Sequence, residues 1–255
     1  HLACISNDPS FELNPDLGKS INYDCFLPLV KASKDAGVNQ FIYASSSSVY
    51  GIKNDEEVTE ELSLEPLTDY SKYKAMCEDI LIAEQEIDFK VTILRPATVC
   101  GYAPRQRLDV IVNILTNNAV NNNLIKIFGG EQKRPNIAVK DMVRAYCHIL
   151  NSPQDLVNGK IYNVGFENHT VDKLASMVKN IVGESVAIEK FKTNDLRSYH
   201  ISSKKITEDL GFKNKFTIDN AINDLVYAMD KKLLIDPMNN PKYANIKVMQ
   251  NIELE

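Results

Sequence analysis

Several features that would assign this 255-residue chain to a specialised class are absent. It has no run of about eighteen apolar residues, so no membrane-spanning helix is predicted. Its five cysteines stand singly, and its four histidines do not cluster with them at metal-ligand spacing. We therefore predict no metal site, and we expect the cysteines to be small buried residues of a cytoplasmic protein.

A basic surface is also absent. The formal net charge is -5, and no stripe of lysine and arginine follows the sequence, which argues against a nucleic-acid partner. Hydrophobic residues make up 44% of the chain and charged residues 25%, which is typical of a globular protein with a substantial core.

A glycine-rich phosphate loop is the third absence. No G-x-x-G-x-x-G spacing occurs, the first glycine is Gly18, and the pair Gly129-Gly130 is typical of a turn. In dinucleotide-binding folds such glycines bring the backbone close to the cofactor pyrophosphate. We therefore predict that this chain contains no binding site for the cofactor pyrophosphate. The chain lacks an initiating Met and starts within an expected buried strand, so we expect a fragment of a larger protein.

Two short segments carry the chemistry that is present. Tyr70 and Lys74 stand four residues apart, which places both side chains on the same face of a helix. A free phenol has a pKa of about 10, and a nearby cation favours the phenolate. A serine run, Ser45 to Ser48, ends an apolar strand. Together these groups can move a proton on or off an alcohol.

The surrounding pattern alternates between helices and strands and predicts an α/β fold. We expect helices at 17–36, 70–83, 110–120, 139–150, 171–182, 203–210 and 219–229, and strands at 41–45, 89–94, 125–128, 160–164 and 186–191. Pro28 should kink the first helix unless a neighbouring group accommodates the lost hydrogen bond, and Thr68 or Asp69 should cap the second. The residues after Lys231 are expected to be irregular.

In order along the chain, several segments resemble the extended short-chain dehydrogenase/reductases, the NAD-dependent sugar-nucleotide epimerase/dehydratase family that includes UDP-glucose/galactose 4-epimerases. The segments are His1-Leu2-Ala3, Gln40 to Ser46, Tyr70 to Lys74, Leu94 to Gly101, Arg134-x-x-Ile137-x-Val139-x-Asp141, Tyr162 to Gly165 and Asp195-x-Arg197-x-Tyr199. The departure is the missing amino-terminal half of the nucleotide-binding fold.

The resemblance implies a partial Rossmann-like parallel sheet and a smaller α/β substrate-capping domain. Residues 1–100, with a return near 139–165, would be the carboxyl-terminal half of the NAD-binding domain. Residues 101–230 would mainly form the capping region, and 231–255 an irregular tail.

The resemblance also implies residue roles. Tyr70 is the expected acid/base, Lys74 tunes it and holds the cofactor ribose, and Ser46 holds the reacting sugar oxygen. Ser45 and Ser47 are the alternatives to Ser46, with hydroxyls satisfied by local backbone bonds. The residues expected to bind the cofactor are Ala3, Asn22, Ser45, Tyr70, Lys74, Pro96 and Val99. Those expected to bind the substrate are Ser46, Thr98, Asn113, Arg134, Asp195 and Arg197.

Several of these roles have structural alternatives. Asn22 is equally suited to bonding the backbone around its helix, and Arg134 to an exposed surface. Thr98 and Asn113 are equally suited to surface or core positions. Arg105 and Arg107 form a basic patch that either approaches the substrate or pairs with Asp109.

By this resemblance the expected activity is NAD-dependent epimerisation of a nucleotide sugar, at C4 of a UDP-hexose; NADP is not excluded as the cofactor. A 4,6-dehydratase carries Asp-Glu where this chain has Ser47-Ser48, which argues against dehydration. The alternatives are a reductase or decarboxylase of the same family and a non-catalytic sugar-nucleotide binding module. A homodimer is expected through the helices at 17–36 and 70–83, although their apolar residues Phe26, Leu29, Met76 and Ile80 equally suit packing on the sheet.

Overall fold

The computed structural model describes residues 1–193, 198 and 200–251, and the chain divides into two units. Unit 1 comprises His1–Pro96, Ala145–Val164 and Ile201–Phe212. Unit 2 comprises Ala97–Arg144, Gly165–His200 and Lys213–Glu255. Helix α6 (Val139–Asn151) contributes residues to both.

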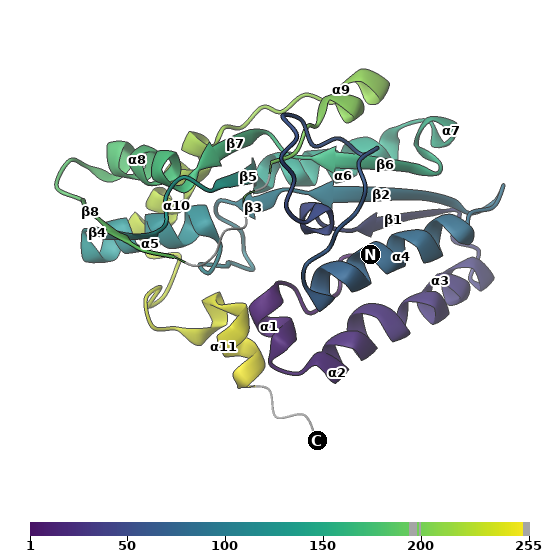
Figure 1. Cartoon of the computed structure of the whole chain (residues 1–255), viewed down its shortest axis with the longest axis horizontal. Helices are drawn as coiled ribbons and strands as arrows, with labels where there is room; N and C mark the ends of the chain where they lie inside the picture. Colours follow the sequence, from purple (N-terminus) through teal and green to yellow (C-terminus); the bar gives the residue numbers. More distant parts are fainter. Residues whose placement is uncertain (194–197, 199, 252–255) are drawn as a thin grey trace. The chain divides into compact units, whose positions relative to one another are not determined.

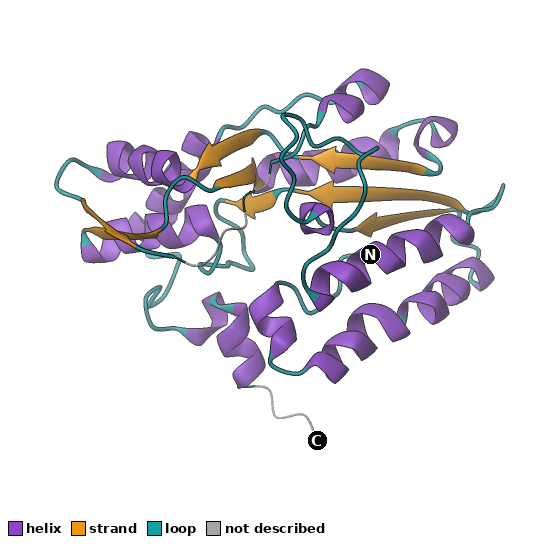
Figure 2. Ribbon diagram, viewed as in Figure 1, coloured by secondary structure: helices purple, strands orange, loops and turns teal. Residues whose placement is uncertain are grey.

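A three-stranded parallel sheet forms the centre of unit 1. Its strands are β1 (Gln40–Ala44), β2 (Lys90–Pro96) and β6 (Lys160–Val164), in the order β1-β2-β6. In Figure 2 the three arrows point the same way, as the parallel register requires. All three strands match predicted ones, since short apolar runs are typical of strands buried on both faces. Their carboxyl ends meet at one edge of the sheet.

Helices α3 (Phe26–Asp35) and α4 (Asp69–Ala83) lie side by side in unit 1 (Figure 1). Their apolar faces pack on β1 and β2. The core cluster of buried side chains is Phe26, Val30, Phe41, Tyr43, Cys77, Leu81, Phe89, Val91 and Ile93. Thr68 caps α4 by accepting a hydrogen bond from the Ser71 N–H at 3.3 Å, which fixes where the helix begins. Unit 1 also holds the short helices α1 (Asp8–Glu12), α7 (Gln154–Val157) and α9 (Lys204–Leu210).

The segment predicted as a helix at 17–36 is helical over almost all of its length, but it is not a single α-helix. The segment is divided into α2 (Pro15–Lys19), the π-helix η1 (Ser20–Asp24) and α3. Pro28 lies in the first turn of α3, where its missing N–H costs little. Its ring would clash with the carbonyl of Asp24 in a continuous α-helix. The wider π turn is closed by the hydrogen bond from Cys25 N–H to Ser20 O at 3.2 Å. It ends at Asp24, whose carbonyl is thereby kept clear of the Pro28 ring.

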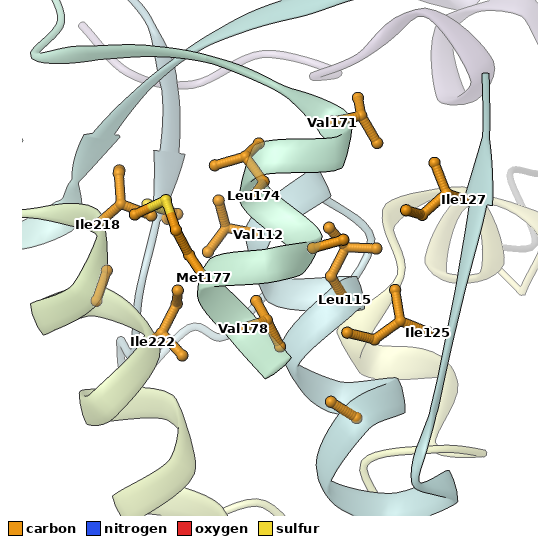
Figure 3. Close-up of a cluster of buried hydrophobic side chains, with 14 of the residues drawn as sticks. Val112, Leu115, Ile125, Ile127, Val171, Leu174, Met177, Val178, Ile218 and Ile222 are labelled. Atoms are coloured by element: carbon orange, nitrogen blue, oxygen red, sulfur yellow. The ribbon is translucent and has the colours of Figure 1, made fainter. Parts of the chain in front are cut away.

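Unit 2 contains two small sheets and three long helices. One sheet has the order β3-β5-β7, formed by β3 (Thr98–Cys100), β5 (Lys133–Ala138) and β7 (Glu167–Thr170). The other pairs β4 (Leu124–Phe128) with β8 (Ala187–Phe191) in parallel. The helices are α5 (Ile111–Asn122), α8 (Val171–Val182) and α10 (Ile218–Asp230). Figure 3 shows how side chains of these helices meet those of β4, among them Val112, Leu115, Ile125, Leu174, Val178 and Ile222.

The irregular tail predicted after Lys231 is wrong for part of its length. Residues Pro241–Tyr243 form the 3-10 turn η3, and Asn245–Gln250 form the helix α11. Tyr243 is buried beside Leu108 and Met229, and its carbonyl accepts the Leu108 N–H at 2.7 Å. Pro237 and Pro241 suggested an irregular segment. Burial of Tyr243 orders residues 241–250 instead.

Among the residues that the structure describes, no helix is long and apolar enough to cross a membrane.

The unit 2 core provides a stability test. Leu115 is 2% exposed, whereas its neighbour Ile114 on α5 is 40% exposed. We expect Leu115→Ala to lower the free energy of unfolding by about 2–5 kcal/mol, because a cavity remains in close-packed surroundings. Ile114→Ala should cost far less. Urea unfolding measures both; equal losses would contradict the packing described here.

Cysteine reactivity tests both cores at once. Burial raises the pKa of Cys77 to about 11 and that of Cys100 to about 12, so neither thiol forms appreciable thiolate near neutral pH. Cys25 and Cys147 are exposed. Treatment of the folded protein with iodoacetamide should label Cys25 and Cys147. Cys77 and Cys100 should stay unlabelled until denaturant is added. Peptide mass spectrometry reads the result, and labelling of Cys77 in the folded state would show that the unit 1 core is open.

Candidate functional site

Lys74 lies at the carboxyl end of β1, in unit 1. Its side chain reaches from α4 to the sheet, where Nζ donates a hydrogen bond to the carbonyl of Ala44 at 2.8 Å. Tyr70 precedes it by one helical turn, and Ser46 follows Ala44 by two residues. The three residues predicted to be catalytic therefore belong to one region of unit 1, built from the end of β1 and the start of α4.

The surroundings of Lys74 are aromatic. Its Nζ lies 4.9 Å from the ring centre of Tyr43 and 5.9 Å from that of Tyr70, both within cation–π range. Lys74 is 5% exposed, and among the described residues no carboxylate pairs with it. A lysine is rarely buried without such a partner. Its remaining N–H groups are donors suited to hydroxyl oxygens, so the site fits a ligand rich in hydroxyls, as a ribose is.

A chain of hydroxyl groups joins Ser46 to the start of α4. Ser46 and Ser48 share a hydrogen bond of 2.9 Å between their Oγ atoms, and Ser71 donates to Ser48 at 2.9 Å. The Thr68 hydroxyl then donates to Asp8 at 2.6 Å, and its oxygen lies within hydrogen-bonding distance of Ser71 Oγ, at 3.0 Å. Neither Ser48 nor Ser71 was predicted to be a site residue, although both lie inside the two segments that carry the predicted ones.

A buried polar network lies next to this chain of hydroxyls. Glu78 and Arg95 form a two-pronged ion pair, with Arg95 Nη2 at 2.6 Å and Nε at 3.1 Å from the carboxylate oxygens. Their side chains are 3% and 4% exposed. Ser45 donates to Glu78, and Arg95 donates to the Tyr50 hydroxyl at 2.7 Å. Removing one partner of such a pair costs about 3–5 kcal/mol, because the other charge stays buried alone.

The electrostatics of the network follow from burial. Burial raises the pKa of Tyr50 to about 12, against the opposing charge of Arg95, so the phenol keeps its proton. Burial works against the charge of Arg95, but the hydrogen bonds and charge of Glu78 outweigh it and raise the pKa of the guanidinium. The network is therefore a fixed ion pair with a neutral tyrosine attached. The sequence signal that was missed is a charged residue, Arg95, at the end of the mostly apolar strand β2.

The side chain of Asn22 bonds to the backbone, which is the structural role considered above as the alternative to cofactor binding. It is buried in η1, where its Oδ1 accepts the Ile5 N–H at 2.8 Å and its Nδ2 donates to the Ile5 carbonyl at 2.9 Å. The amide thus closes a pair of bonds to one backbone residue. Ala3 is exposed near the start of the chain, and Pro96 is the last residue of β2.

The residues expected to bind the substrate belong to unit 2, apart from Ser46. Thr98 and Val99 lie on β3, and Arg134 lies on β5 in the same small sheet. Asn113 is buried and engaged with backbone, since its Oδ1 accepts the Gly101 N–H at 2.9 Å and its Nδ2 donates to Arg107 O at 2.7 Å. Asp195 and Arg197 lie outside the described residues.

Of the two arginines in the basic patch, Arg107 pairs with Asp109 at 2.9 Å. Arg105 donates instead to Asn245 Oδ1 at 3.0 Å, and the other carboxylate oxygen of Asp109 accepts the Asn245 N–H at 2.8 Å. The two arginines and Asp109 therefore hold Asn245, the first residue of α11, against the loop that precedes α5.

A cofactor with a ribose fits the residues of unit 1 in part. Lys74 offers buried donors for ribose hydroxyls, and the edge of the sheet next to Ser45 and Pro96 is where open α/β folds bind nucleotides. The residues that would hold the pyrophosphate, a glycine-rich turn, do not occur in this sequence. In the part of the chain that the structure describes, no group of three or more His, Cys, Asp or Glu residues could hold a metal ion.

Known proteins resemble this chain over much of its length. The model of the NAD dependent epimerase/dehydratase family matches residues 1–165. The chain is 31% identical over 170 residues to an uncharacterized UDP-glucose epimerase, YtcB, of Bacillus subtilis, covering 66% of this chain and 52% of that protein. It is 31% identical over 211 residues to dTDP-D-glucose 4,6-dehydratase of Mus musculus, covering 78% and 58%. The chain thus spans little more than half the length of these two relatives.

Solved structures share the fold. UDP-glucose 4-epimerase of Thermotoga maritima, solved with UDP-glucose, superimposes with a TM-score of 0.81 at 26% identity, covering 92% of this chain and 77% of that one. UDP-glucuronic acid 4-epimerase of Bacillus cereus, in complex with UDP-glucuronic acid and NAD, gives 0.80 at 25% identity, covering 92% and 75%.

The role found for Asn22 is testable by substitution. Asn22→Ala leaves the N–H and carbonyl of Ile5 without partners in a buried place, and we expect a loss of about 1–3 kcal/mol in the free energy of unfolding. Asn39→Ala, at an exposed asparagine of the same unit, should change it little. Chemical denaturation compares the two variants, and an Asn22→Ala protein as stable as the control would contradict the bonding described.

Proposed function

Because the chain belongs to the NAD-dependent epimerase/dehydratase family, we propose that its protein is a nucleotide-sugar epimerase acting at C4 of a UDP-hexose. Epimerisation at a carbon that bears a hydroxyl requires transient oxidation, inversion and re-reduction. The overall reaction consumes no reductant, since hydride and proton return to the same carbon and oxygen.

The observation that carries the proposal is the position of Lys74. A buried lysine, which has no carboxylate partner among the residues that the structure describes, lies one helical turn from Tyr70, and its Nζ donates a hydrogen bond to the end of the strand that precedes Ser46. Such an unpaired buried charge is costly in a purely structural setting. It serves a reaction in which Tyr70 must give up and regain a proton near neutral pH.

The proposed steps use these three side chains. Bound NAD would supply the hydride acceptor and donor. Tyr70 takes the proton from the sugar hydroxyl as the carbon is oxidised, and returns it when the opposite face is reduced. Ser46 donates a hydrogen bond to the same oxygen throughout, and Lys74 holds the ribose hydroxyls and favours the phenolate.

Substrate binding is assigned to unit 2 in this proposal. Arg134 would meet the diphosphate, because a planar guanidinium matches phosphate oxygens with two parallel hydrogen bonds. Asp195 and Arg197 would grip the diphosphate and ribose, and Thr98 would contact the sugar. Asn113 is better regarded as the residue that shapes the loop between Gly101 and Arg107, because both ends of its amide bond to that loop.

Support for epimerisation over dehydration comes from Ser47 and Ser48. Elimination of water needs an acid and a base beside the reacting sugar. Ser47 is buried in η2 (Ser47–Tyr50), and the Ser48 hydroxyl is bonded to Ser46 and Ser71. Hydroxyls do not replace a carboxyl pair at neutral pH.

We also propose a homodimer through α3 and α4. Phe26 is buried in the unit 1 core and is excluded from such a contact. Leu29 and Met76 are 36% and 41% exposed and remain available for it.

The test is product analysis with UDP-glucose and NAD. We expect UDP-galactose to form up to the equilibrium ratio, followed by NMR, without net NADH. Steady consumption of NADPH would indicate a reductase, release of carbon dioxide from a UDP-hexuronate a decarboxylase, and loss of water a dehydratase. Binding of the nucleotide sugar without turnover would indicate a non-catalytic module. Each of these four outcomes contradicts the proposal.

Matched tyrosine variants test the proposed acid/base. Tyr70→Phe should lower kcat by about 10²–10⁴-fold, the usual contribution of a positioned general acid or base. Tyr73→Phe removes a hydroxyl from the same helix, where the ring stacks on Tyr23, and should leave kcat near that of the unaltered protein. Similar kcat values for the two variants would exclude Tyr70 as the acid/base.

A further inference from the structure

The segment that carries Ser46 is attached at both of its ends to one buried ion pair. At its start, the Ser45 hydroxyl donates to the carboxylate of Glu78. At its end, the Tyr50 hydroxyl accepts from Arg95 Nη1 at 2.7 Å. Ser45, Tyr50, Glu78 and Arg95 are all buried. Between the two attachments lie Ser46 and the turn η2.

The ion pair in turn joins three elements of unit 1. Glu78 belongs to α4 and Arg95 to β2, and the Tyr50 hydroxyl donates onward to Asn163 of β6 at 2.8 Å. Ser45 also bonds through its backbone, donating its N–H to Leu94 O at 2.8 Å. The segment is thus fixed to the same sheet that holds Lys74.

Spacing on α4 connects the ion pair to the proposed acid/base. Tyr70, Lys74 and Glu78 follow one another at intervals of one helical turn and share a face. Lys74 bonds to the carbonyl of Ala44, and Glu78 bonds to the hydroxyl of the next residue, Ser45. A displacement of Glu78 would move the helix and the serine segment relative to each other.

We propose that Glu78 and Arg95 are positioning residues, which set the place of the Ser46 hydroxyl relative to Tyr70 by holding both ends of the Ser45–Tyr50 segment. Neither contacts the sugar or the cofactor in this role. The effect on catalysis rests on the function proposed for Ser46, whereas the anchoring itself does not depend on any substrate.

The anchoring is tested with the ion pair left intact, because removing either charge endangers folding. The double variant Ser45→Ala/Tyr50→Phe deletes only the two hydroxyls that connect the segment to Glu78 and Arg95. The matched control is Tyr162→Phe, which removes a tyrosine hydroxyl bonded to Asp209 at 3.1 Å in the same unit. The measurement is amide hydrogen exchange in the folded protein without substrate, resolved by peptide.

Protected amides within the segment report its position. The Ser48 N–H donates to Ser46 Oγ, and the Gly51 N–H donates to Ser48 O, both at 3.2 Å. In the double variant we expect exchange in residues 45–51 to accelerate at least about tenfold, with α3 unchanged. The control should leave residues 45–51 at the original rate. Unchanged exchange in the segment, or equal acceleration throughout unit 1, would overturn the proposal.

Kinetics separate this role from that of a merely stabilising contact. With a turned-over substrate, we expect the double variant to lower kcat about 10–100-fold while KM stays within about threefold, as misplacement of a catalytic group does. A rise in KM at unchanged kcat would overturn the positioning role. If no nucleotide sugar is turned over by the unaltered protein, the proposed function fails, and the exchange experiment still decides whether the ion pair anchors the segment.

Discussion

Two side chains of α4, one helical turn apart, bond to two consecutive residues where β1 ends. Lys74 donates a hydrogen bond to the carbonyl of Ala44, and Glu78 accepts one from the hydroxyl of Ser45. Because a rigid helix and a hydrogen-bonded strand each have a fixed spacing, two such bonds set both the height and the rotation of α4 on the sheet. The positions of Tyr70 and Ser46, and hence the chemistry proposed for the protein, depend on this double attachment.

Much of unit 1 could be predicted because its signals are local. The apolar run of β1, the cap at Thr68 and the four-residue spacing of Tyr70 and Lys74 each need only a few neighbouring residues to be recognised. Strand β6 was also expected, and in the structure it pairs with β2. In unit 2 the helices and the strands β4 and β8 were expected near their observed bounds, since their apolar periodicity is strong.

The remainder depends on contacts between residues far apart in the sequence. Tyr50 and Asn163 are 113 residues apart, and no local pattern indicates that their side chains meet. Strands β5 and β7 consist largely of polar residues and proline, so neither has the apolar run that identifies a buried strand. The formation of α11 likewise depends on the packing of Tyr243 against Leu108, which lies far away in the sequence. The π turn within the helix predicted at 17–36 was not expected either, although it accommodates Pro28 without ending the helical path.

The division of the chain into units has a consequence for its synthesis. Unit 1 is made of three separate stretches, and β2 obtains its partner β6 only after the first stretch of unit 2 has been translated. The last stretch adds the bond from Ser202 N–H to Val58 O, at 2.9 Å, to a loop made much earlier. Neither unit can therefore be completed on the ribosome before translation of the other has begun. We therefore expect a slow final folding step, because contacts between distant stretches of the chain must form last.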